Sequence, residues 1–385
     1  MFTLLLAIIY LSFISLGLPD SVLGAAWPII YTDFNVPISF AGIVSIIISA
    51  GTITSSLLSD RLTKWLGAGK ITAISVGLTA IALFGFSTCT EFWQMCLWAV
   101  PYGLGAGSVD AALNNYVALH YASRHMNWLH CMWGVGTVIG PAILSYALVG
   151  GQKWSMGYRY ISYLQIALTL VLILSLPLWK KQASSNEKTA KSEPLNIKDI
   201  FKISGAFEVI SAFFCYCALE STASLWACSY MVWHNGIDKE TAAGYASAFF
   251  VGITAGRFIS GFLTYKLNDT QMVRLGGALA ILGIVSLFLP ISTAFTVAGI
   301  VLIGLGCAPI YPAIIHSTPV HFGTENSQAL IGIQMASAYL GSLTMPPLFG
   351  IIANHISISL LPIFMLVISV AMVLMHEKLV KKTKR

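Results

Sequence analysis

Long apolar runs and short polar interruptions alternate along the whole chain. A membrane-spanning helix needs about 20 mostly apolar residues to cross a hydrocarbon core of about 30 Å. Twelve runs are long enough, and most of the loops between them are shorter than ten residues. The pattern predicts twelve transmembrane helices, at residues 2–30, 38–59, 70–88, 92–120, 127–150, 158–179, 204–234, 241–264, 271–289, 294–316, 326–350 and 356–375.

The composition supports the same fold class. Hydrophobic residues make up 57% of the chain and charged residues only 9%, with a mean hydropathy of +0.79. Such a chain cannot form an ordinary soluble surface. We therefore expect an all-α polytopic membrane protein whose main surroundings are the lipid bilayer. The uncharged N-terminal run continues into a full span, so we expect a first helix there and not a removed signal peptide.

The basic residues indicate the orientation in the membrane. Lys and Arg accumulate in short loops on the cytoplasmic side. With both termini cytoplasmic, 17 of the 21 Lys and Arg residues fall on that side. The net charge of +6 is then explained without a nucleic-acid partner. The short loops favour a bacterial cytoplasmic (inner) membrane, and we expect a monomer.

A single hydrophilic stretch divides the chain into two halves. We predict an N-terminal six-helix bundle at residues 1–179, a cytoplasmic linker at 180–203, and a C-terminal six-helix bundle at 204–385 with a short basic tail. The halves resemble each other. Gly103-Leu104-Gly105 recurs 201 residues later, Ala50-Gly51 recurs as Ala255-Gly256, Gly136 and Pro141 recur 205 residues later, and Asp20 falls on Glu220.

Three acidic residues lie inside apolar runs: Asp20, Asp110 and Glu220. An ionised side chain at the bilayer centre costs roughly 2.5 kcal/mol or more, so such residues usually face a cavity and serve a function. A transporter is the class of protein that this pattern favours. The alternative is that each acid is a hydrogen-bonded structural group in a polar helix interface.

The helix ends carry a first family resemblance. Two six-helix halves joined by a basic loop resemble the major facilitator superfamily, and Ser56 to Leu62 resembles its Gly-x-Leu-x-Asp-Arg-x-Gly loop. Ser56 and Thr63 replace the two glycines, so the Asp60-Arg61 pair is what survives. The resemblance implies that Asp60 and Arg61 latch a cytoplasmic gate. Arg257 lies inside a span near its cytoplasmic end, so we expect it to snorkel or to brace the gate. The alternative is a solvated loop that only sets the topology.

Helices 4, 5 and 7 resemble a narrower family, the fucose, galactose and glucose proton symporters. The similarity rests on Gly105 to Asn114, on Met126 to His130 with Gly136 to Pro141, and on Tyr216 to Glu220. It implies proton-coupled import of a hexose, or a related small polar solute, by alternating access. It also implies proton coupling at Asp110 and Asp20, with Glu220 as the C-terminal partner.

The residues themselves agree with that chemistry. Asp110 and Asn114 are four apart, so they share one helix face, and an acid beside an amide suits a polyhydroxy compound. A carboxylate held away from water can take up a proton at ordinary pH and release it when water enters. The expected solute-binding residues are Asn114, His130, Trp133, Trp226, Tyr311 and Gln334.

His130 and Trp133 depart from the family pattern, because the sugar symporters have polar side chains there. A lone His near a span end is often only packed, and a Trp at a span end often belongs to the interfacial belt. Gln334 and Tyr311 could merely bond neighbouring helices. These departures leave the solute open.

Other function classes find little support in the sequence. No phosphate-binding loop and no metal-ligand spacing occurs, so we expect no enzyme, no metal and no cofactor, with a proton or sodium as the coupling ion. The first alternative to sugar import is a proton antiporter that exports a drug or metabolite, since Gly136 to Pro141 partly resembles an antiporter motif. The second is a membrane sensor that does not transport.

Overall fold

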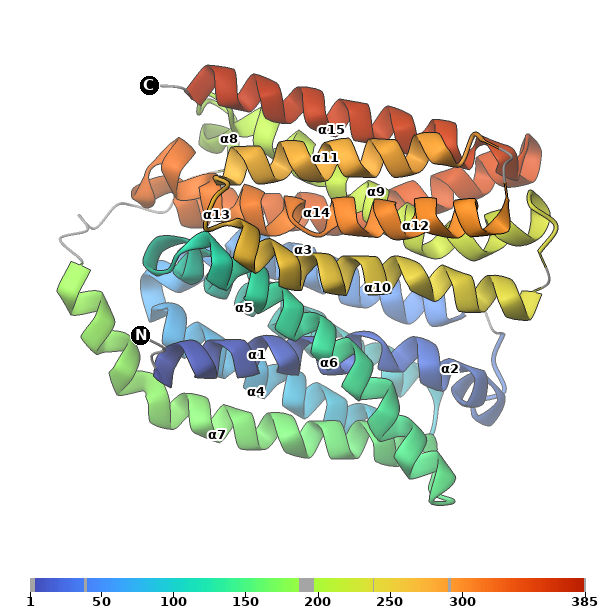
Figure 1. Cartoon of the computed structure of the whole chain (residues 1–385). Coiled ribbons are helices and arrows are strands. Elements are labelled where there is room, and N and C mark those ends of the chain that lie inside the picture. Colours follow the sequence, from blue (N-terminus) through green and yellow to red (C-terminus); the bar gives the residue numbers. More distant parts are fainter. Residues whose placement is uncertain (1–3, 38–39, 187–196, 238, 290–291, 384–385) are drawn as a thin grey trace. The chain divides into compact units, whose positions relative to one another are not determined.

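The computed structural model describes residues 4–37, 40–186, 197–237, 239–289 and 292–383 (Figure 1). Within these ranges all twelve expected segments are helical, and no strand occurs. The elements of the N-terminal half are α1 (Leu4–Asp20), α2 (Val22–Asp33), α3 (Ala41–Leu66), α4 (Ala68–Phe86), α5 (Phe92–His120), α6 (Ser123–Val149) and α7 (Trp154–Asn186). Those of the C-terminal half are α8 (Ile197–Ile200), α9 (Ala206–Trp233), α10 (Lys239–Leu263), α11 (Asp269–Ser286), α12 (Thr293–Cys307), α13 (Ile310–Phe322), α14 (Thr324–His355), η2 (Ile358–Leu360) and α15 (Leu361–Thr383).

Two of the expected spans are interrupted. The first expected span consists of α1 and α2, with Pro19 in the last turn of α1. The tenth expected span consists of α12 and α13, with Pro309 between them. Proline has no N–H for the helical hydrogen-bond ladder, and its ring crowds the preceding turn. The first interruption places Asp20 at the end of a helix, in the middle of an apolar run.

Nine of the described helices or helix pairs are long and apolar enough to cross a membrane. Two of the expected spans, α5 and α11, do not meet that criterion, and the stretch Ala248–Leu263 of α10 is apolar but shorter than a span. Polar side chains lower the hydropathy of α5, which contains Asp110 and Asn114, and of α11, which contains Asp269 and Arg274.

The chain forms two compact units. The first comprises Met1–Tyr116 with Leu129–Leu195, and the second comprises Val117–Trp128 with Asn196–Arg385. The short segment Val117–Trp128, at the end of α5 and the start of α6, thus packs with the C-terminal half of the chain. The expected linker at 180–203 begins later in the structure, because α7 continues to Asn186. Residues 187–196 of the expected linker lie outside the described residues.

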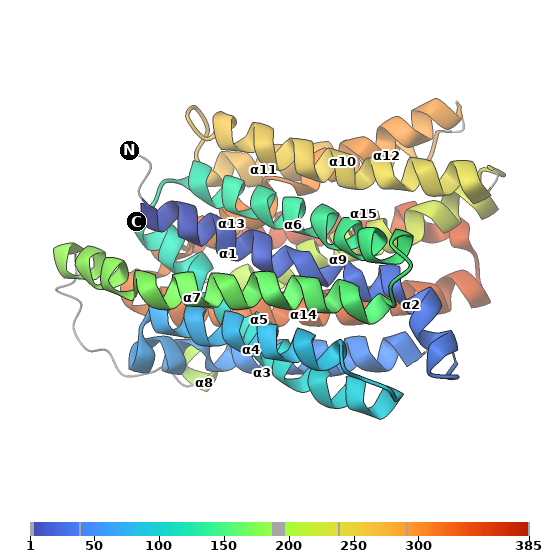
Figure 2. The same cartoon turned by 90° about the horizontal axis from the view of Figure 1, so that it is seen from below.

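Helices pack lengthwise within each unit (Figures 1 and 2). In the first unit α4 lies along α7, and in the second α9 lies along both α14 and α15, while α12 lies along α10 and α11. An aromatic cluster in the core of the first unit includes Trp27, Phe86, Tyr102 and Tyr158. These packed helices form the frame that carries the candidate site.

Glycine contacts reveal that the two units repeat each other. A Cβ on Gly103 of α5 would collide with the carbonyl oxygen of Ile48 on α3, and a Cβ on Gly304 of α12 would collide with that of Phe249 on α10. Both residues of the second pair lie 201 positions after those of the first. Only glycine lets two helix backbones approach so closely. The repeat is therefore one of packing as well as of sequence.

The same register corrects one sequence match. Gly51 approaches Gly103 and the backbone of residue 104, whereas Gly252 approaches Gly304 and the backbone of residue 305. The structural counterpart of Gly51 is therefore Gly252, at an offset of 201, and not Gly256, at an offset of 205. The matched Ala-Gly dipeptides misled the alignment, because small residues recur every few positions along a packed helix face.

Candidate functional site

Asp20 is held by two uncharged donors in the first unit. The Tyr102 hydroxyl donates to its Oδ1 atom across 3.1 Å, and the Trp133 indole Nε1–H donates to its Oδ2 atom across 2.8 Å. Asp20 itself is exposed at the end of α1. Hydrogen bonds to a carboxylate stabilise its charged form, while its exposure leaves room for a proton or a solute to reach it. The sequence named Asp20 and Trp133 separately but missed Tyr102 and the link between them.

Close packing of α1 on α6 creates this contact. A Cβ on Gly17 would collide with the carbonyl oxygen of Trp133, and one on Gly136 or Gly140 would collide with carbonyl oxygens of α1. The glycines thus bring the backbone of α1 directly against α6. Trp133 then projects from α6 beside the break that ends α1, which is why its indole reaches Asp20.

A second cluster joins α5 to α6. Asn114 Nδ2 donates to Asp110 Oδ1 across 2.8 Å, and its Oδ1 atom lies 3.0 Å from His130 Nε2. Since the amide oxygen can only accept, His130 carries its proton on Nε2 in this contact. Asn114 is fully buried and His130 is 5% exposed. The expected acid, amide and imidazole therefore form one chain of hydrogen bonds.

The two clusters share the α1–α6 interface. His130 and Trp133 are three residues apart on one face of α6. The His130 ring packs edge-on against Phe13 of α1, with 5.4 Å between the ring centroids, and Trp133 bonds Asp20 of the same helix. α6 thus bonds Asp20 directly and reaches Asp110 through Asn114.

The acid of the C-terminal half has a basic partner. Glu220 Oε1 on α9 lies 3.4 Å from Arg257 Nη2 on α10, and the Arg257 side chain is 5% exposed. Tyr216, one turn before Glu220, lies beside the same guanidinium. Arg257 is thus buried beside Glu220 inside the unit, which differs from the expected snorkelling, while its expected part in bracing the gate stays a prediction.

The remaining expected solute-binding residues lie in the second unit, and each has a packing contact. Trp226 Nε1 donates to the carbonyl oxygen of Pro346 across 3.0 Å, and the Tyr311 hydroxyl lies 3.1 Å from Met335 Sδ. Gln334 is fully buried; its Oε1 atom accepts from Thr318, and its Nε2 has no hydrogen-bond partner among the described residues. An unsatisfied buried amide is costly, so Gln334 has a donor available for a solute or water.

The Asp60-Arg61 pair lies within a helix and not in a loop. The expected span ends at residue 59, but α3 continues to Leu66. Asp60 is 4% exposed, and its Oδ2 atom lies 3.1 Å from Lys64 Nζ one turn later. The helix continues because Leu62, Trp65 and Leu66 extend its apolar character past the charged residues.

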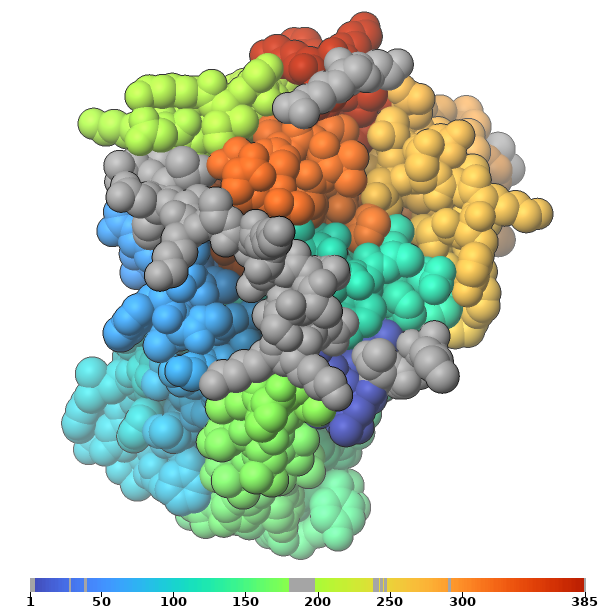
Figure 3. All heavy atoms as spheres, turned by 90° about the vertical axis from the view of Figure 1, so that its left-hand side faces the viewer, coloured from blue at the N-terminus to red at the C-terminus, as the bar shows by residue number. Residues whose placement is uncertain are grey.

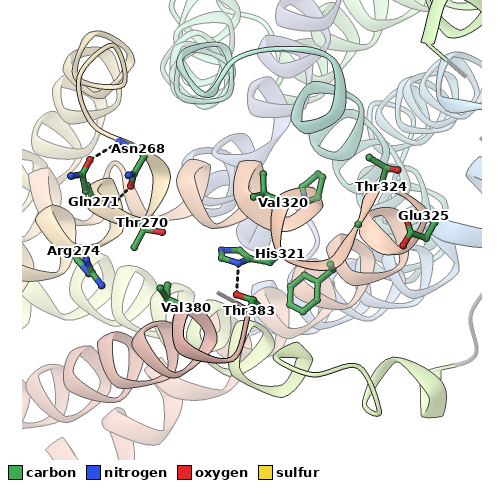
Figure 4. A pocket seen from close by; sticks show the side chains of 13 residues that line it. Asn268, Thr270, Gln271, Arg274, Val320, His321, Thr324, Glu325, Val380 and Thr383 are labelled. Carbon is green, nitrogen blue, oxygen red and sulfur yellow. Dashed lines mark hydrogen bonds between the residues drawn. The ribbon is translucent and has the colours of Figure 1, made fainter. Parts of the chain in front are cut away.

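Sequence reasoning missed a polar cluster at one end of the second unit. His316 on α13, Asp269 at the start of α11, and Tyr121 and Ser123 of the Val117–Trp128 segment meet there. The available signal was weak, since His316 is a single imidazole in an apolar run. Nearby, a cavity of about 840 Å³ opens between α11, α13 and α15, lined by residues that include Arg274, His321 and Thr383 (Figure 4).

No group of three His, Cys, Asp or Glu side chains that could hold a metal occurs in the part of the chain that the structure describes. The candidate site consists of carboxylates, one imidazole, amides and aromatic donors. Such groups can bind a polar solute and move protons.

Comparison with known proteins agrees with this architecture. The chain is 22% identical to Bypass of stop codon protein 6 of Saccharomyces cerevisiae, over 91% of this chain and 77% of that protein. It is 20% identical to the glucose/mannose transporter GlcP of Bacillus subtilis, over 79% and 77%. It is 24% identical to the probable nitrate transporter NarT of Staphylococcus aureus, over 89% and 88%.

Among solved structures, FucP in its outward conformation has a TM-score of 0.81 to this chain, with 99% of both chains covered and 15% identity. At that identity the likeness shows the fold alone. The family model of the Major Facilitator Superfamily matches residues 9–293 and 209–385, which together span nearly the whole chain. With two repeated bundles and membrane-spanning helices throughout, the chain belongs to the Major Facilitator Superfamily.

Proposed function

We propose that this protein is a secondary active transporter that imports a hexose, or a related small polar solute, together with protons by alternating access. The observation that carries the proposal is the chain Asp110, Asn114 and His130, in which an acid, an amide and an imidazole are bonded in sequence. Sugar hydroxyls both donate and accept hydrogen bonds, so they suit this mixture of groups. The similarity to a glucose/mannose transporter is consistent with such a solute.

Asp20 and Asp110 are the proposed proton carriers. Asp20 is exposed and bonded only by neutral donors in the contacts described above, so a proton can replace either hydrogen bond without breaking an ion pair. Asp110 is tied to Asn114, so its protonation changes how the amide is held and thereby the solute contacts. Each acid thus connects proton uptake to groups that face a solute.

Glu220 has a different proposed part, because Arg257 lies against it. Protonation of Glu220 would remove its attraction to Arg257 and leave a buried cation without a counter-charge. We infer that Glu220 exchanges protons only when a conformational change or a solute separates the pair. Trp226, Tyr311 and Gln334 are the proposed solute contacts of this unit, and Asp60 and Arg61 the proposed gate residues.

Export of a drug or metabolite in exchange for protons is the second candidate. The exposed carboxylate of Asp20 beside the Trp133 indole is the observation that favours it, since an acid next to an aromatic ring suits a cationic aromatic solute. Import and export would use the same acids. The direction of proton and solute movement separates them.

Uptake of labelled hexoses into proteoliposomes, with and without an inward proton gradient, tests the proposal. Accumulation that a protonophore abolishes would support proton-coupled sugar import. An absence of uptake for every hexose, combined with proton-driven movement of a cationic dye, would overturn it in favour of export. Tags at both termini, detected in right-side-out bacterial vesicles, would test the proposed inner-membrane location with cytoplasmic ends.

A further inference from the structure

We propose that His316 and Asp269 form a proton-binding site that fastens the segment Val117–Trp128 to α11 and α13, and that loss of the bound proton releases this segment. The site belongs entirely to the second unit, and it is separate from the acids discussed above. It does not depend on which solute the protein moves. Figure 3 views the end of the molecule where this segment (teal) lies next to residues of α13 (orange) and α11 (yellow).

Both ring nitrogens of His316 face oxygen atoms. Nδ1 lies 2.6 Å from Asp269 Oδ2, and Nε2 lies 3.0 Å from the carbonyl oxygen of Tyr121. A backbone carbonyl can only accept a hydrogen bond, so Nε2 must carry a hydrogen. At the other nitrogen, a hydrogen must lie between Nδ1 and the carboxylate, whichever of the two atoms holds it.

The proton count follows from this geometry. If Nδ1 holds the second hydrogen, the pair is an imidazolium and a carboxylate; if Asp269 holds it, the pair is a neutral imidazole and a carboxylic acid. In either form the pair contains one proton more than a neutral histidine beside an ionised aspartate. Without that proton, the lone pairs of Nδ1 and Oδ2 would face each other across 2.6 Å.

The pair is sheltered, which makes this repulsion matter. The side chains of His316 and Asp269 are 17% and 15% exposed. Ser123, from the Val117–Trp128 segment, donates its hydroxyl to Asp269 Oδ1 across 2.5 Å. Two residues of the segment, Tyr121 and Ser123, are therefore bonded to the two members of the pair. A change in the proton count acts directly on the attachment of this segment.

Other titratable groups on the neighbouring elements have contacts of their own. Arg124 lies over the Tyr265 ring, 5.2 Å from its centroid, and His125 packs against the rings of Tyr121 and Trp128. Arg274 of α11 bonds Glu377 through two nitrogens, and His321 of α13 bonds Thr383. His120 of α5, Lys266 after α10, Tyr311 of α13 and His376 of α15, which packs against α11, are further titratable groups here, and His321 also interacts electrostatically with Asp269. Asp269 is the acid bonded to His316.

An apolar contact anchors the same segment independently of pH. The Trp128 ring packs against Phe262 of α10 at 5.7 Å between centroids, and a Cβ on Gly261 would overlap the indole. The segment thus has one anchor that does not titrate and one that does. Deprotonation is expected to free Val117–Ser123 first, while Trp128 stays packed.

The direction of the pH effect is fixed by the extra proton. Above a pH of about 6.5, where a free imidazole is neutral, the attached state binds one more proton than the released state, so attachment is lost as pH rises beyond that point. For a one-proton linkage, the equilibrium changes by at most about tenfold per pH unit. Cytoplasmic pH would then bias the movement of this segment, since its loop is expected on the cytoplasmic side.

Hydrogen–deuterium exchange of the full-length protein in lipid nanodiscs, without any solute, tests the proposal. The protection of amides 117–123 is measured from pH 5 to pH 9 after correction for the intrinsic exchange rate. The wild type should lose protection steadily above one midpoint. Protection that stays constant over the whole range would overturn the proposal, and the result is independent of whether any sugar is transported.

Two variants and one control sharpen the test. In Asp269→Asn the amide can donate to a neutral His316 Nδ1 while Nε2 still donates to Tyr121, so the segment should stay protected at all pH values. His316→Ala should leave it unprotected throughout. His234→Gln is the control in the same unit, because His234, directly after α9, bonds Ser359 instead of a member of this cluster and should keep the wild-type profile. An unchanged pH profile in Asp269→Asn would contradict the assignment.

Discussion

Trp133 of α6 holds the Asp20 carboxylate through a 2.8 Å hydrogen bond, and Trp154 of α7 holds the Asp33 carboxylate through a 2.7 Å bond of the same kind. Both pairs lie in the first unit, and both acids end a helix, α1 or α2. Only Asp20 also receives a tyrosine hydroxyl and lies at the α1–α6 interface. The chain therefore supplies its own matched comparison between a proposed proton carrier and a structural acid.

Asp20→Asn is expected to abolish uphill solute accumulation, because an amide cannot bind and release a proton at physiological pH. Asp33→Asn, which disturbs an equivalent indole contact, should leave accumulation intact. Both variants are measured by uptake into proteoliposomes at equal protein incorporation. Equal losses in the two variants would mean that the effect is structural and that Asp20 carries no coupled proton.

His130 is expected to matter as a hydrogen-bond donor to Asn114. His130→Gln retains an N–H that can reach Asn114 Oδ1, whereas His130→Leu leaves that buried oxygen without this donor. Leaving a buried acceptor unsatisfied costs about 1–3 kcal/mol. The leucine variant should therefore lose thermal stability and solute affinity, measured by thermal unfolding in detergent and by binding calorimetry, and the glutamine variant should retain most of both. Identical behaviour of the two would show that the donor is unimportant.

The same substitution, glycine to alanine, is expected to have different effects at the α1–α6 interface and at an open position on α2. A Cβ at Gly140 would overlap the carbonyl oxygen of Leu18, so Gly140→Ala should destabilise the protein by about 1–3 kcal/mol. Gly24 on α2 has no heavy atom within 4 Å of the added carbon, so Gly24→Ala should be neutral or stabilising by up to about 1 kcal/mol. Thermal unfolding in one detergent compares them. A stable Gly140→Ala variant would contradict the close approach of α1 and α6.

The fold could be predicted from the sequence because membrane spans depend on local composition. Twelve apolar runs predicted twelve helical segments, and the helices extend beyond the expected ends mainly where apolar residues continue, as at Leu66. The breaks at Pro19 and Pro309 could have been predicted from the missing N–H of proline. A proline in an apolar run indicates a kink as readily as a break, however, since neighbouring helices can also satisfy an interrupted backbone.

The contacts of the site could not be predicted in the same way. Asp20 and Trp133 are 113 positions apart, and Glu220 and Arg257 are 37 apart. Hydropathy and periodicity say which face of a helix a residue occupies, but not which side chain lies across from it. The pairing at Asp110 and Asn114 was predictable, because both residues lie on one helix four positions apart. His316 escaped notice because its partners, Asp269 and Tyr121, come from two segments that are distant in the sequence.

The ion pair of Glu220 and Arg257 gives a test in which burial and distance predict different outcomes. Its closest atoms are 3.4 Å apart, with side chains 23% and 5% exposed, whereas Arg274 and Glu377 approach to 2.6 Å with side chains 49% and 31% exposed. Removing one partner of a buried pair costs about 3–5 kcal/mol, whereas solvent screens an exposed pair. We expect Glu220→Gln to lie near the lower end of that range, since Glu220 is partly exposed, and Glu377→Gln to change stability little. The double variant Glu220→Gln with Arg257→Met should recover much of the loss, because no buried charge is then left uncompensated.

Double-mutant cycles on both pairs, from thermal unfolding in detergent, measure the two coupling energies. A larger coupling for Arg274 and Glu377 would mean that distance outweighs burial, and that Glu220 is free to exchange protons without first leaving Arg257.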